Sequence, residues 1–407
     1  MPKHTFHYGL DISADIITAA RAAVEPSGKI ADISFESCPC LGIKDGLIQE
    51  LGLLAENISG LLGRLSLTCP DKIKSLYVSM PSLRIKAKHS CGLLPISERS
   101  NKIITSSDVA RVNQQAYNLG LNIEEQVLYS LPQWYTLDNQ SRVSNPLGLY
   151  SHSLGVDFLL ITALYSDMQN VVSAVEKAGY KTKAVVLSSL AGSFAALPPE
   201  AKAKGCCFLD IGFDSSRMLI FKDGILKELE GFDFGAQDLT LSLAGELKLP
   251  YELAQGIKAS YGRASSGDRD SEQDVLVRQK DNTYRTLKRK LIYEIIGKKS
   301  DEMFSLIKER LLKYGGEQDY PAGIILSGRD VLLEGFLERL EAKVGLSAHL
   351  ARMENPPLKD PSYATVVGLI KYAASCYPQV NLFKLSAYGN IFQKLIHKSR
   401  ELYHEYF

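Results

Sequence analysis

Apolar residues recur at two different periods along the chain, and the two periods alternate. Near the N-terminus, short apolar runs separated by turn residues predict three strands within residues 6–35. From Gly46 to Leu67, leucine and isoleucine recur at helical spacing and predict a helix. Segments of the two kinds continue to alternate to about residue 376. The pattern therefore predicts an α/β fold.

Further elements follow from the same reading. Ser106-Ser107-Asp108 predicts the start of a helix, because these residues accept hydrogen bonds from exposed backbone N–H groups. The polar stretch 262–290 predicts a solvated excursion with a strand or two at most. The remaining clear segments are helices over 237–247, 291–313 and 331–344, and a strand over 323–328.

One pattern occurs twice, about two hundred residues apart. Residues 6–11 read FHYGLD and residues 206–211 read CCFLDI. Each is an apolar strand with an aspartate near its end, Asp11 or Asp210, followed by a turn of mostly small residues and a second apolar strand. Two such hairpins are typical of a duplicated fold that holds a phosphate–metal unit from both sides, so an actin-like architecture is the first hypothesis. Two ordinary core hairpins would leave the same pattern.

Composition narrows the class of protein. A chain of 407 residues suits two large lobes or three to four subdomains. The net charge of +1 provides no global attraction to nucleic acid or to a membrane. No apolar run approaches the roughly 20 residues that span a bilayer, and the first ten residues do not resemble a signal peptide. The seven cysteines lack zinc-site spacing, which indicates reduced thiols in a cytoplasmic protein.

Several motifs together resemble one family, the bacterial cell-division protein FtsA of the actin/Hsp70/sugar-kinase superfamily. LPQWYTLD at 131–138 with NPLGL at 145–149 is similar to the family's IPQEY…NPxGxxG signature. Two positions differ: Trp134 stands where the family has glutamate, and His152 stands in place of the signature's final glycine-spaced residue. LPIS at 94–97 and TSSDV at 105–109 resemble the family's own inserted subdomain. GIILSG at 323–328 and YATVVGLI at 363–370 resemble its adenosine motif and the following helix.

The resemblance implies a duplicated actin-like ATPase fold with an FtsA-type insert and a C-terminal amphipathic helix. We expect subdomain 1A over 1–83 and 164–204, subdomain 1C over 84–163, subdomain 2A over 205–238 and 321–376, subdomain 2B over 239–320, a linker over 377–388 and the helix over 389–407.

By the same resemblance, ATP or ADP with Mg²⁺ would bind between the hairpins. The expected contacts are Asp11, Ser13, Asp210, Gly212, Ser215, Gly235, Lys258, Gly328 and Arg329, with Asp11 and Asp210 holding Mg²⁺ through water. The turns depart from the family, whose glycines let backbone N–H groups approach phosphate. Here they read Ser13-Ala14-Asp15 and Gly212-Phe213-Asp214-Ser215. Each added carboxylate repels a phosphate charge by about 3 kcal/mol at ~5 Å. We therefore expect at most weak hydrolysis and no enzyme; an empty cleft kept for assembly is the alternative.

Residues 389–407 carry an apolar stripe at helical spacing with basic residues on the remaining surface. This pattern predicts an in-plane membrane helix; a helix that docks on protein is the alternative. The residues expected at the membrane are Ile391, Phe392, Leu395, Ile396, Lys398, Leu402, Tyr406 and Phe407.

The resemblance implies an adaptor that links the FtsZ ring to the cytoplasmic face of the inner membrane at the division septum. It would assemble with itself into actin-like protofilaments, recruit other divisome proteins and bind no nucleic acid. The FtsZ C-terminal peptide would bind subdomain 2B near Lys298 and Lys299; a solvated helix face is the alternative there. Two other functions stay open: an ATP-dependent enzyme such as a sugar kinase, and a pilus-assembly scaffold similar to PilM.

Overall fold

The computed structural model describes residues 5–44, 46–68, 72–80, 84–97, 102–265, 273–278, 284–353 and 359–374. The chain forms two compact units. The first unit comprises the described residues up to Phe194, the short segment Gly224–Glu230 and the described residues from Thr365 onward. The second unit comprises Ala195–Asp223 and Gly231–Ala364.

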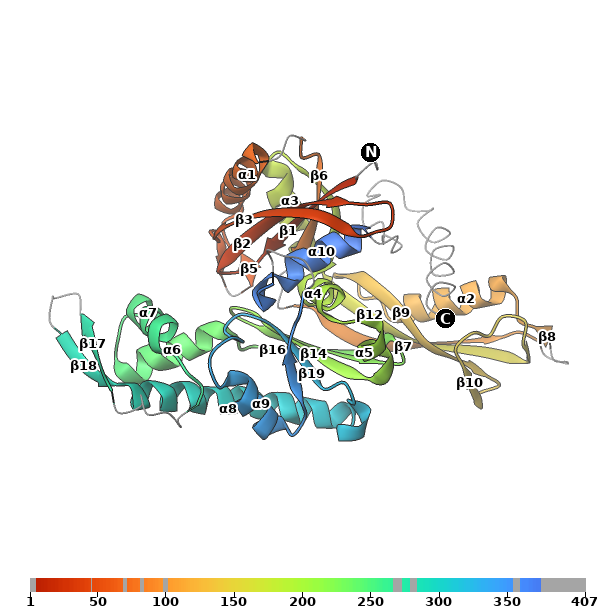
Figure 1. Ribbon diagram of the computed structural model, residues 1–407. Coiled ribbons are helices and arrows are strands. Elements are labelled where there is room, and N and C mark those ends of the chain that lie inside the picture. Colours follow the sequence, from red (N-terminus) through yellow and green to blue (C-terminus); the bar gives the residue numbers. More distant parts are fainter. Residues whose placement is uncertain are drawn as a thin grey trace. The chain divides into compact units, whose positions relative to one another are not determined.

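A five-stranded sheet forms the centre of the first unit, in the order β13-β6-β1-β2-β3 (Figure 1). The strand β1 pairs with β6 in parallel and with β2 in antiparallel register, from Thr5↔Val24 to Ile12↔Ile17. The strands are β1 (Thr5–Ile12), β2 (Ile16–Val24), β3 (Ile30–Pro39), β6 (Ser75–Met80) and β13 (Lys181–Leu187).

Helices cover both faces of this sheet, because its strands are apolar on both sides. The helices are α1 (Leu51–Leu67), α3 (Tyr165–Lys177), α4 (Ser188–Ala196) and α10 (Ala364–Ala374). Leu76 and Val78 of β6 pack on one face with α1 and α3. Tyr77 of the same strand packs on the other face with α4 and α10.

Two predicted helix starts are wrong. The helix expected from Gly46 begins at Leu51, because Leu47–Ile48 (β5) pairs with Ile43–Lys44 (β4) as a small hairpin. The helix expected over 331–344 is α9 (Phe336–Val344). Gly335, just before it, has φ +77°, which a right-handed helix cannot include.

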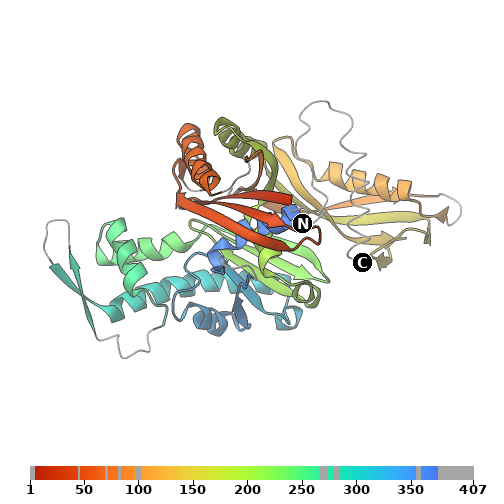
Figure 2. The same ribbon diagram turned by 45° about the horizontal axis from the view of Figure 1, so that its top comes forward.

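The insert between β6 and α3 is an antiparallel sheet, in the order β10-β9-β12-β7, with the helix α2 (Ser106–Leu119) along one face (Figure 2). Val112 and Ala116 of that helix pack on Val156, Phe158 and other apolar residues of the sheet. The strands are β7 (Lys86–Pro95), β9 (Glu125–Leu137), β10 (Ser141–Val143) and β12 (Ser153–Leu164), and β8 (Lys102–Ile103) pairs with β11 (Tyr150–Ser151).

The second unit repeats the topology of the first. Its sheet has the order β16-β15-β14-β19-β20, so the strand that carries Asp210 again lies between an antiparallel and a parallel neighbour. This repetition confirms the predicted duplication. The strands are β14 (Cys206–Ile211), β15 (Ser216–Lys222), β16 (Ile225–Phe232), β19 (Ile324–Gly328) and β20 (Ala348–Leu350), of which β16 crosses the boundary between the units.

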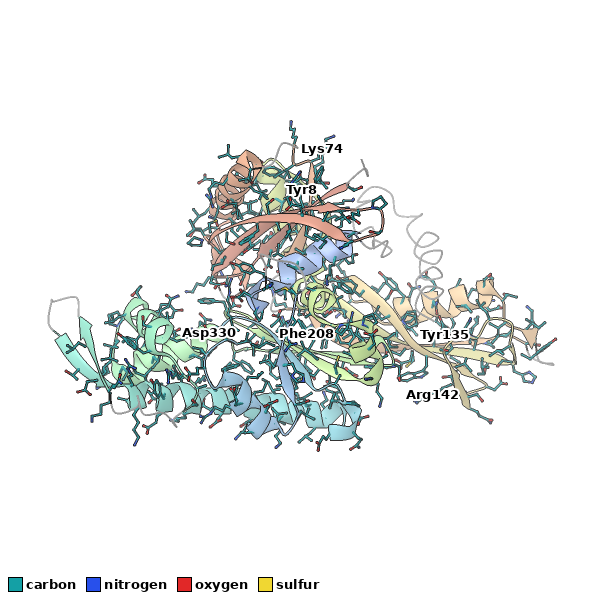
Figure 3. The ribbon with its side chains drawn as sticks, viewed as in Figure 1. Tyr8, Lys74, Tyr135, Arg142, Phe208 and Asp330 are labelled. Carbon is teal, nitrogen blue, oxygen red and sulfur yellow. The ribbon has the colours of Figure 1, made fainter. Side chains whose placement is uncertain are left out.

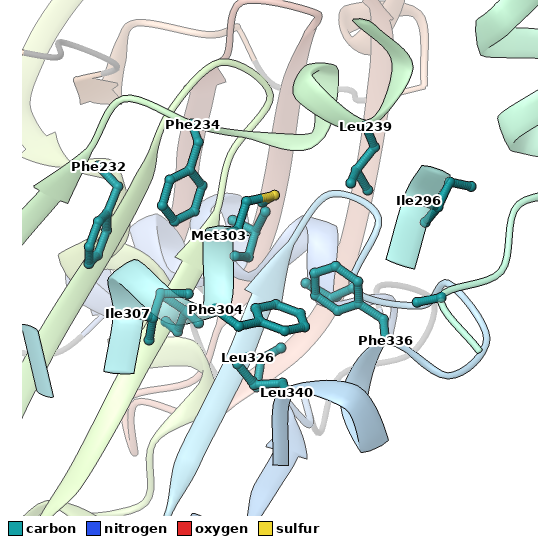
Figure 4. Close-up of a cluster of buried hydrophobic side chains, with 14 of the residues drawn as sticks. Phe232, Phe234, Leu239, Ile296, Met303, Phe304, Ile307, Leu326, Phe336 and Leu340 are labelled. Atoms are coloured by element: carbon teal, nitrogen blue, oxygen red, sulfur yellow. The ribbon is translucent and has the colours of Figure 1, made fainter. Parts of the chain in front are cut away.

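The helices of the second unit form its core with this sheet. Phe304 and Phe336 meet edge to face at 4.9 Å, beside Phe234, Leu239 and Leu326 (Figure 4). The polar stretch 262–290 contains the hairpin of β17 (Asp274–Arg278) and β18 (Tyr284–Lys288), as expected. The helices are α5 (Pro199–Lys204), α6 (Ala236–Leu247), α7 (Tyr251–Tyr261), α8 (Arg289–Tyr314) and α9, with 3₁₀ turns at Glu317–Asp319 and Pro361–Tyr363.

Candidate functional site

The two repeated hairpins close with the same turn. In the first, the Ser13 N–H donates to the Ile16 carbonyl at 3.2 Å, and in the second the Gly212 N–H donates to the Ser215 carbonyl at 2.9 Å. Each donor is the residue directly after the first strand, and each acceptor lies three residues later. The sequence repeat therefore corresponds to a repeated local structure, one copy in each unit.

The first hairpin holds its own added carboxylate. Ser13 Oγ donates to Asp15 Oδ1 at 2.9 Å, and the Asp15 carbonyl accepts from the Cys40 N–H at 2.8 Å. Burial, reinforced by the charge of Asp15, raises the pKa of the Cys40 thiol to about 12. Asp11 lies opposite Thr18 in the same hairpin. Because Ser13 already donates to Asp15, phosphate would compete with a carboxylate for this hydroxyl.

The second hairpin supports the start of α6. The N–H groups of Ala236 and Gln237 donate to the carbonyls of Gly212 and Phe213, each at 2.9 Å. A Cβ at Gly235 would lie 2.3 Å from the Phe213 carbonyl oxygen, so only glycine allows this approach. Gly212 and Gly235 therefore adjoin, as the nucleotide prediction requires, but two N–H groups of the helix start already have carbonyl partners.

The end of β19 lies against the end of β14. Gly328 has φ +105°, and the Arg329 N–H donates to the Ile211 carbonyl at 2.6 Å. These contacts bring Gly328 and Arg329 beside the strand that carries Asp210, which pairs with Ser327.

Lys258, a residue expected to contact the nucleoside, is mostly buried on α7. Its Nζ donates to the Ala236 carbonyl at 3.1 Å and forms an ion pair with Asp330, which is labelled in Figure 3. The lysine therefore joins α7 to the start of α6 and to the loop after β19. All the expected nucleotide contacts of the second unit thus lie on connected elements around the end of β14.

Asp210, an expected Mg²⁺ ligand, is surrounded by groups that already satisfy a carboxylate. Ser327 Oγ donates to Asp210 Oδ1 at 2.7 Å. Burial raises the pKa of Asp210, while that hydrogen bond and the positive charges of Arg217 and Arg329 act in the opposite direction. Two guanidinium groups beside one carboxylate do not suit a divalent cation. No group of three or more metal-ligating side chains occurs among the described residues.

Arg217 was missed by the sequence analysis. It is 8% exposed on β15, directly opposite Asp210. The signal was present in the printed sequence, because an arginine stands directly before the apolar run Met218–Phe221. Its charge partners could not be read from the sequence, since Asp233 lies beyond the next strand.

The expected partner-binding lysines lie on α8 with different surroundings. Lys298 is 71% exposed and its Nζ is 3.9 Å from Glu246, whereas Lys299 is 28% exposed and pairs with Glu302 at 3.1 Å. Only Lys298 lines a groove of about 420 Å³. The groove is lined by Tyr293, Glu294, Lys298, Asp301, Glu302, Ser305, Arg339 and Lys343.

Arg339 is held within this groove by its neighbours. It donates to both carboxylate oxygens of Asp301 at 2.7 Å and to the Ala264 carbonyl at 2.7 Å. This bidentate pair lowers the pKa of Asp301. Lys298 and Lys343 are therefore the cations of the groove without a bidentate carboxylate among its lining residues, and Lys343 was not predicted.

The predicted membrane helix, 389–407, lies outside the described residues. Within the part of the chain that the structure describes, no helix is both long enough and apolar enough to cross a bilayer.

Two family models match this chain. One, described as the SHS2 domain inserted in FTSA, matches residues 84–162, and the other, described as cell division protein FtsA, matches residues 207–368. Together they span more than half of the chain.

Relatives named cell division protein FtsA match most of this chain. The protein of Pseudomonas aeruginosa is 26% identical over 371 residues, which cover 89% of this chain and 88% of the relative. That of Escherichia coli K12 is 26% identical over 378 residues, covering 89% of each. That of Buchnera aphidicola subsp. Schizaphis graminum is 27% identical over 382 residues, covering 91% of each.

Solved structures show the same fold. A chain of the PilM–PilN type IV pilus biogenesis complex aligns with a TM-score of 0.62 at 17% identity, covering 91% of this chain and 98% of that chain. MreB5 of Spiroplasma citri bound to ADP aligns with a TM-score of 0.55 at 9% identity, covering 90% and 95%. At these identities the likeness concerns the fold alone, and it confirms the predicted actin-like architecture.

Proposed function

Since this chain belongs to the FtsA family of cell-division proteins, we propose that it is an adaptor that links the FtsZ ring to the cytoplasmic face of the inner membrane at the septum. It would assemble with copies of itself into actin-like protofilaments and recruit other division proteins. The observation that carries the proposal is the FtsA-type insert, matched over residues 84–162, inside a duplicated actin-like fold.

The groove on α8 is the proposed site for the acidic C-terminal peptide of FtsZ. Lys298 and Lys343 line it, and Lys298 is 71% exposed, so its amine can approach a carboxylate from solvent. Lys299 would act indirectly, because its ion pair offsets the charge of Glu302 on the groove wall. Exposed charges of this kind mainly steer and orient an acidic partner.

The elements around the end of β14 in the second unit are the proposed site for ATP or ADP. The support is the adjoining placement of Gly212, Gly235, Gly328 and Arg329, together with solved relatives of this fold that are bound to ADP or AMPPNP. We propose binding rather than efficient hydrolysis, since the turn hydroxyl of Ser13 is already bonded to Asp15.

Vesicle co-sedimentation tests the adaptor function. The full chain and a 1–386 truncation are each mixed with FtsZ and anionic vesicles. We expect only the full chain to pellet, and to bring FtsZ with it, because the removed segment carries the apolar stripe and basic residues of an in-plane membrane helix. If both forms stay in the supernatant, the adaptor function as stated is wrong.

Charge reversal on α8 tests the FtsZ site separately. We expect Lys298→Glu to weaken the binding of a synthetic FtsZ C-terminal peptide by about three- to tenfold, as measured by fluorescence anisotropy, with the loss reduced at high salt. Lys290→Glu is the matched control, since it changes an exposed lysine of the same helix outside the groove. An equal effect of both variants would show that only the net charge of the helix matters.

A further inference from the structure

A buried arginine lies next to the turn of the second hairpin. Arg217 is on β15, 8% exposed, and directly opposite Asp210 across the antiparallel pair of β14 and β15. Residues opposite each other in such a pair project from the same face of the sheet. The guanidinium and the carboxylate of Asp210 are therefore on one face, next to Ser327 of the following strand.

The charges of three carboxylates act on this guanidinium. Asp233, Asp210 and Asp214 each favour its charged form and oppose the effect of burial, which lowers the pKa of Arg217. A buried arginine is tolerated only where carboxylates compensate the loss of water. These carboxylates thus compensate the charge of the buried guanidinium.

The adjacent strand β16 has a glycine, Gly231, where the Arg217 guanidinium packs against it. A Cβ at Gly231 on β16 would lie 2.3 Å from Arg217 Nη1 and 3.2 Å from its Cζ. Gly231 does not have a positive φ, so its backbone does not require glycine. Glycine is needed at position 231 because the Arg217 guanidinium occupies the space of a side chain there. The charge of Asp233, two residues after Gly231, also acts on this guanidinium.

We propose that Arg217 is the permanent cation of the second hairpin, and that this hairpin holds no divalent metal. The guanidinium takes the neutralising role among Asp210, Asp214 and Asp233 that a hydrated Mg²⁺ would otherwise take. Any nucleotide that binds here, which rests on the function proposed above, binds without a metal ligand from Asp210. Unlike a bound ion, the arginine is present whether or not nucleotide is bound.

The first test uses the full-length wild-type protein. Mn²⁺ binding is followed by electron paramagnetic resonance with and without ATP, and ATP affinity is measured in Mg²⁺ and in EDTA. We expect no bound Mn²⁺ that depends on Asp210 and equal ATP affinity in both buffers. Stoichiometric Mn²⁺ that Asp210→Asn removes, or a Mg²⁺ requirement for ATP binding that Asp210→Asn abolishes, overturns the proposal. If ATP binds in neither buffer, nucleotide binding is refuted, and the Mn²⁺ measurement still decides the role of Arg217.

The second test removes the cation. Arg217→Met leaves three carboxylates without their guanidinium, so we expect its Tm to be lower by several degrees and to be partly restored by Mg²⁺. We also expect this variant to gain Mn²⁺ binding. The double variant Arg217→Met/Asp210→Asn should lose that binding again. Should Arg217→Met not fold, Gly231→Ala displaces the same group less severely and must show the same Mg²⁺-dependent Tm. The control is Gly245→Ala, where a Cβ meets nothing within 4 Å. The proposal is overturned if the folded variants bind no Mn²⁺ and their Tm does not change when Mg²⁺ is added.

Discussion

Gly328 ends β19 with φ +105°, a backbone conformation that residues with a Cβ rarely adopt. In the sequence it was a nucleotide contact, by resemblance. In the structure it has a second requirement, since a Cβ there would lie 2.0 Å from the Ile211 carbonyl oxygen. Lys258 was likewise expected at the nucleoside, and its amine bonds to the Ala236 carbonyl and Asp330. Gly328 and Lys258 therefore have structural roles in the second unit, whether or not they contact a nucleotide.

We expect Gly328→Ala to lower the free energy of unfolding by about 2–4 kcal/mol, because backbone strain and the clash with Ile211 act together. Urea unfolding followed by circular dichroism measures the effect. The matched control is Gly345→Ala, which has φ +88° but open space around its Cβ. Equal losses in the two variants would mean that strain alone, and not the contact with Ile211, makes glycine necessary at 328.

Helices and strands with a strong apolar period were predicted well, and their ends were not. The period over 237–247 and 291–313 gave α6 and α8 to within two residues. The predicted helix at 106 begins there, but its N-cap is Thr105, which forms a capping box with Asp108. The helix α7 was missed, because it is short and follows Pro250 in a segment where polar residues alternate closely with apolar ones. Caps depend on individual hydrogen bonds, which an apolar period does not report.

We expect Thr105→Ala to destabilise the insert by about 1 kcal/mol, the usual cost of losing an N-cap hydroxyl. The hydroxyl accepts from the Asp108 N–H at 3.4 Å and donates to the Asp108 carboxylate at 2.6 Å. Thermal unfolding would report the change as a lower Tm. Ser107→Ala, at an exposed position in the first turn of α2, should have little effect. A similar Tm for Thr105→Ala and wild type would remove the capping role.

On the scale of the whole first unit, side chains of the insert form hydrogen bonds with the segment Gly224–Glu230, which is far away in sequence. His89 Nδ1 is 2.8 Å from Asp157 Oδ1, and His89 Nε2 is 2.9 Å from Glu228 Oε1. Gln133 Nε2 donates to the Leu226 carbonyl at 3.0 Å. Hydrogen bonds to the two carboxylates raise the pKa of His89 to about 10. The imidazolium therefore persists at neutral pH and links two acidic side chains.

The sign of the pH dependence follows from the raised pKa. The stabilisation by protonated His89 is complete below its unfolded pKa near 6.5 and is lost as pH rises through about 10. Nitrogen-15 NMR of the imidazoles measures this titration, and Glu228→Gln should lower the pKa by removing one partner. His89→Gln should flatten the alkaline fall in Tm, with His152→Gln as the control. A His89 that titrates near 6.5 in the wild type would contradict the link.

The alternating apolar periods, the repeated hairpin and the insert motifs are local in the chain, so the printed residues alone determine an α/β fold, its duplication and its family. Through the family resemblance they also predict Asp210, Gly212 and Gly328 as residues of one nucleotide site, and the structure places the three on adjoining elements. The charge balance of that site is different. Arg217 meets Asp210 across a hairpin and Asp233 beyond another strand, while His89 meets Glu228 across 139 residues. Electrostatic energy depends on distance and burial in space, and only the tertiary structure supplies these.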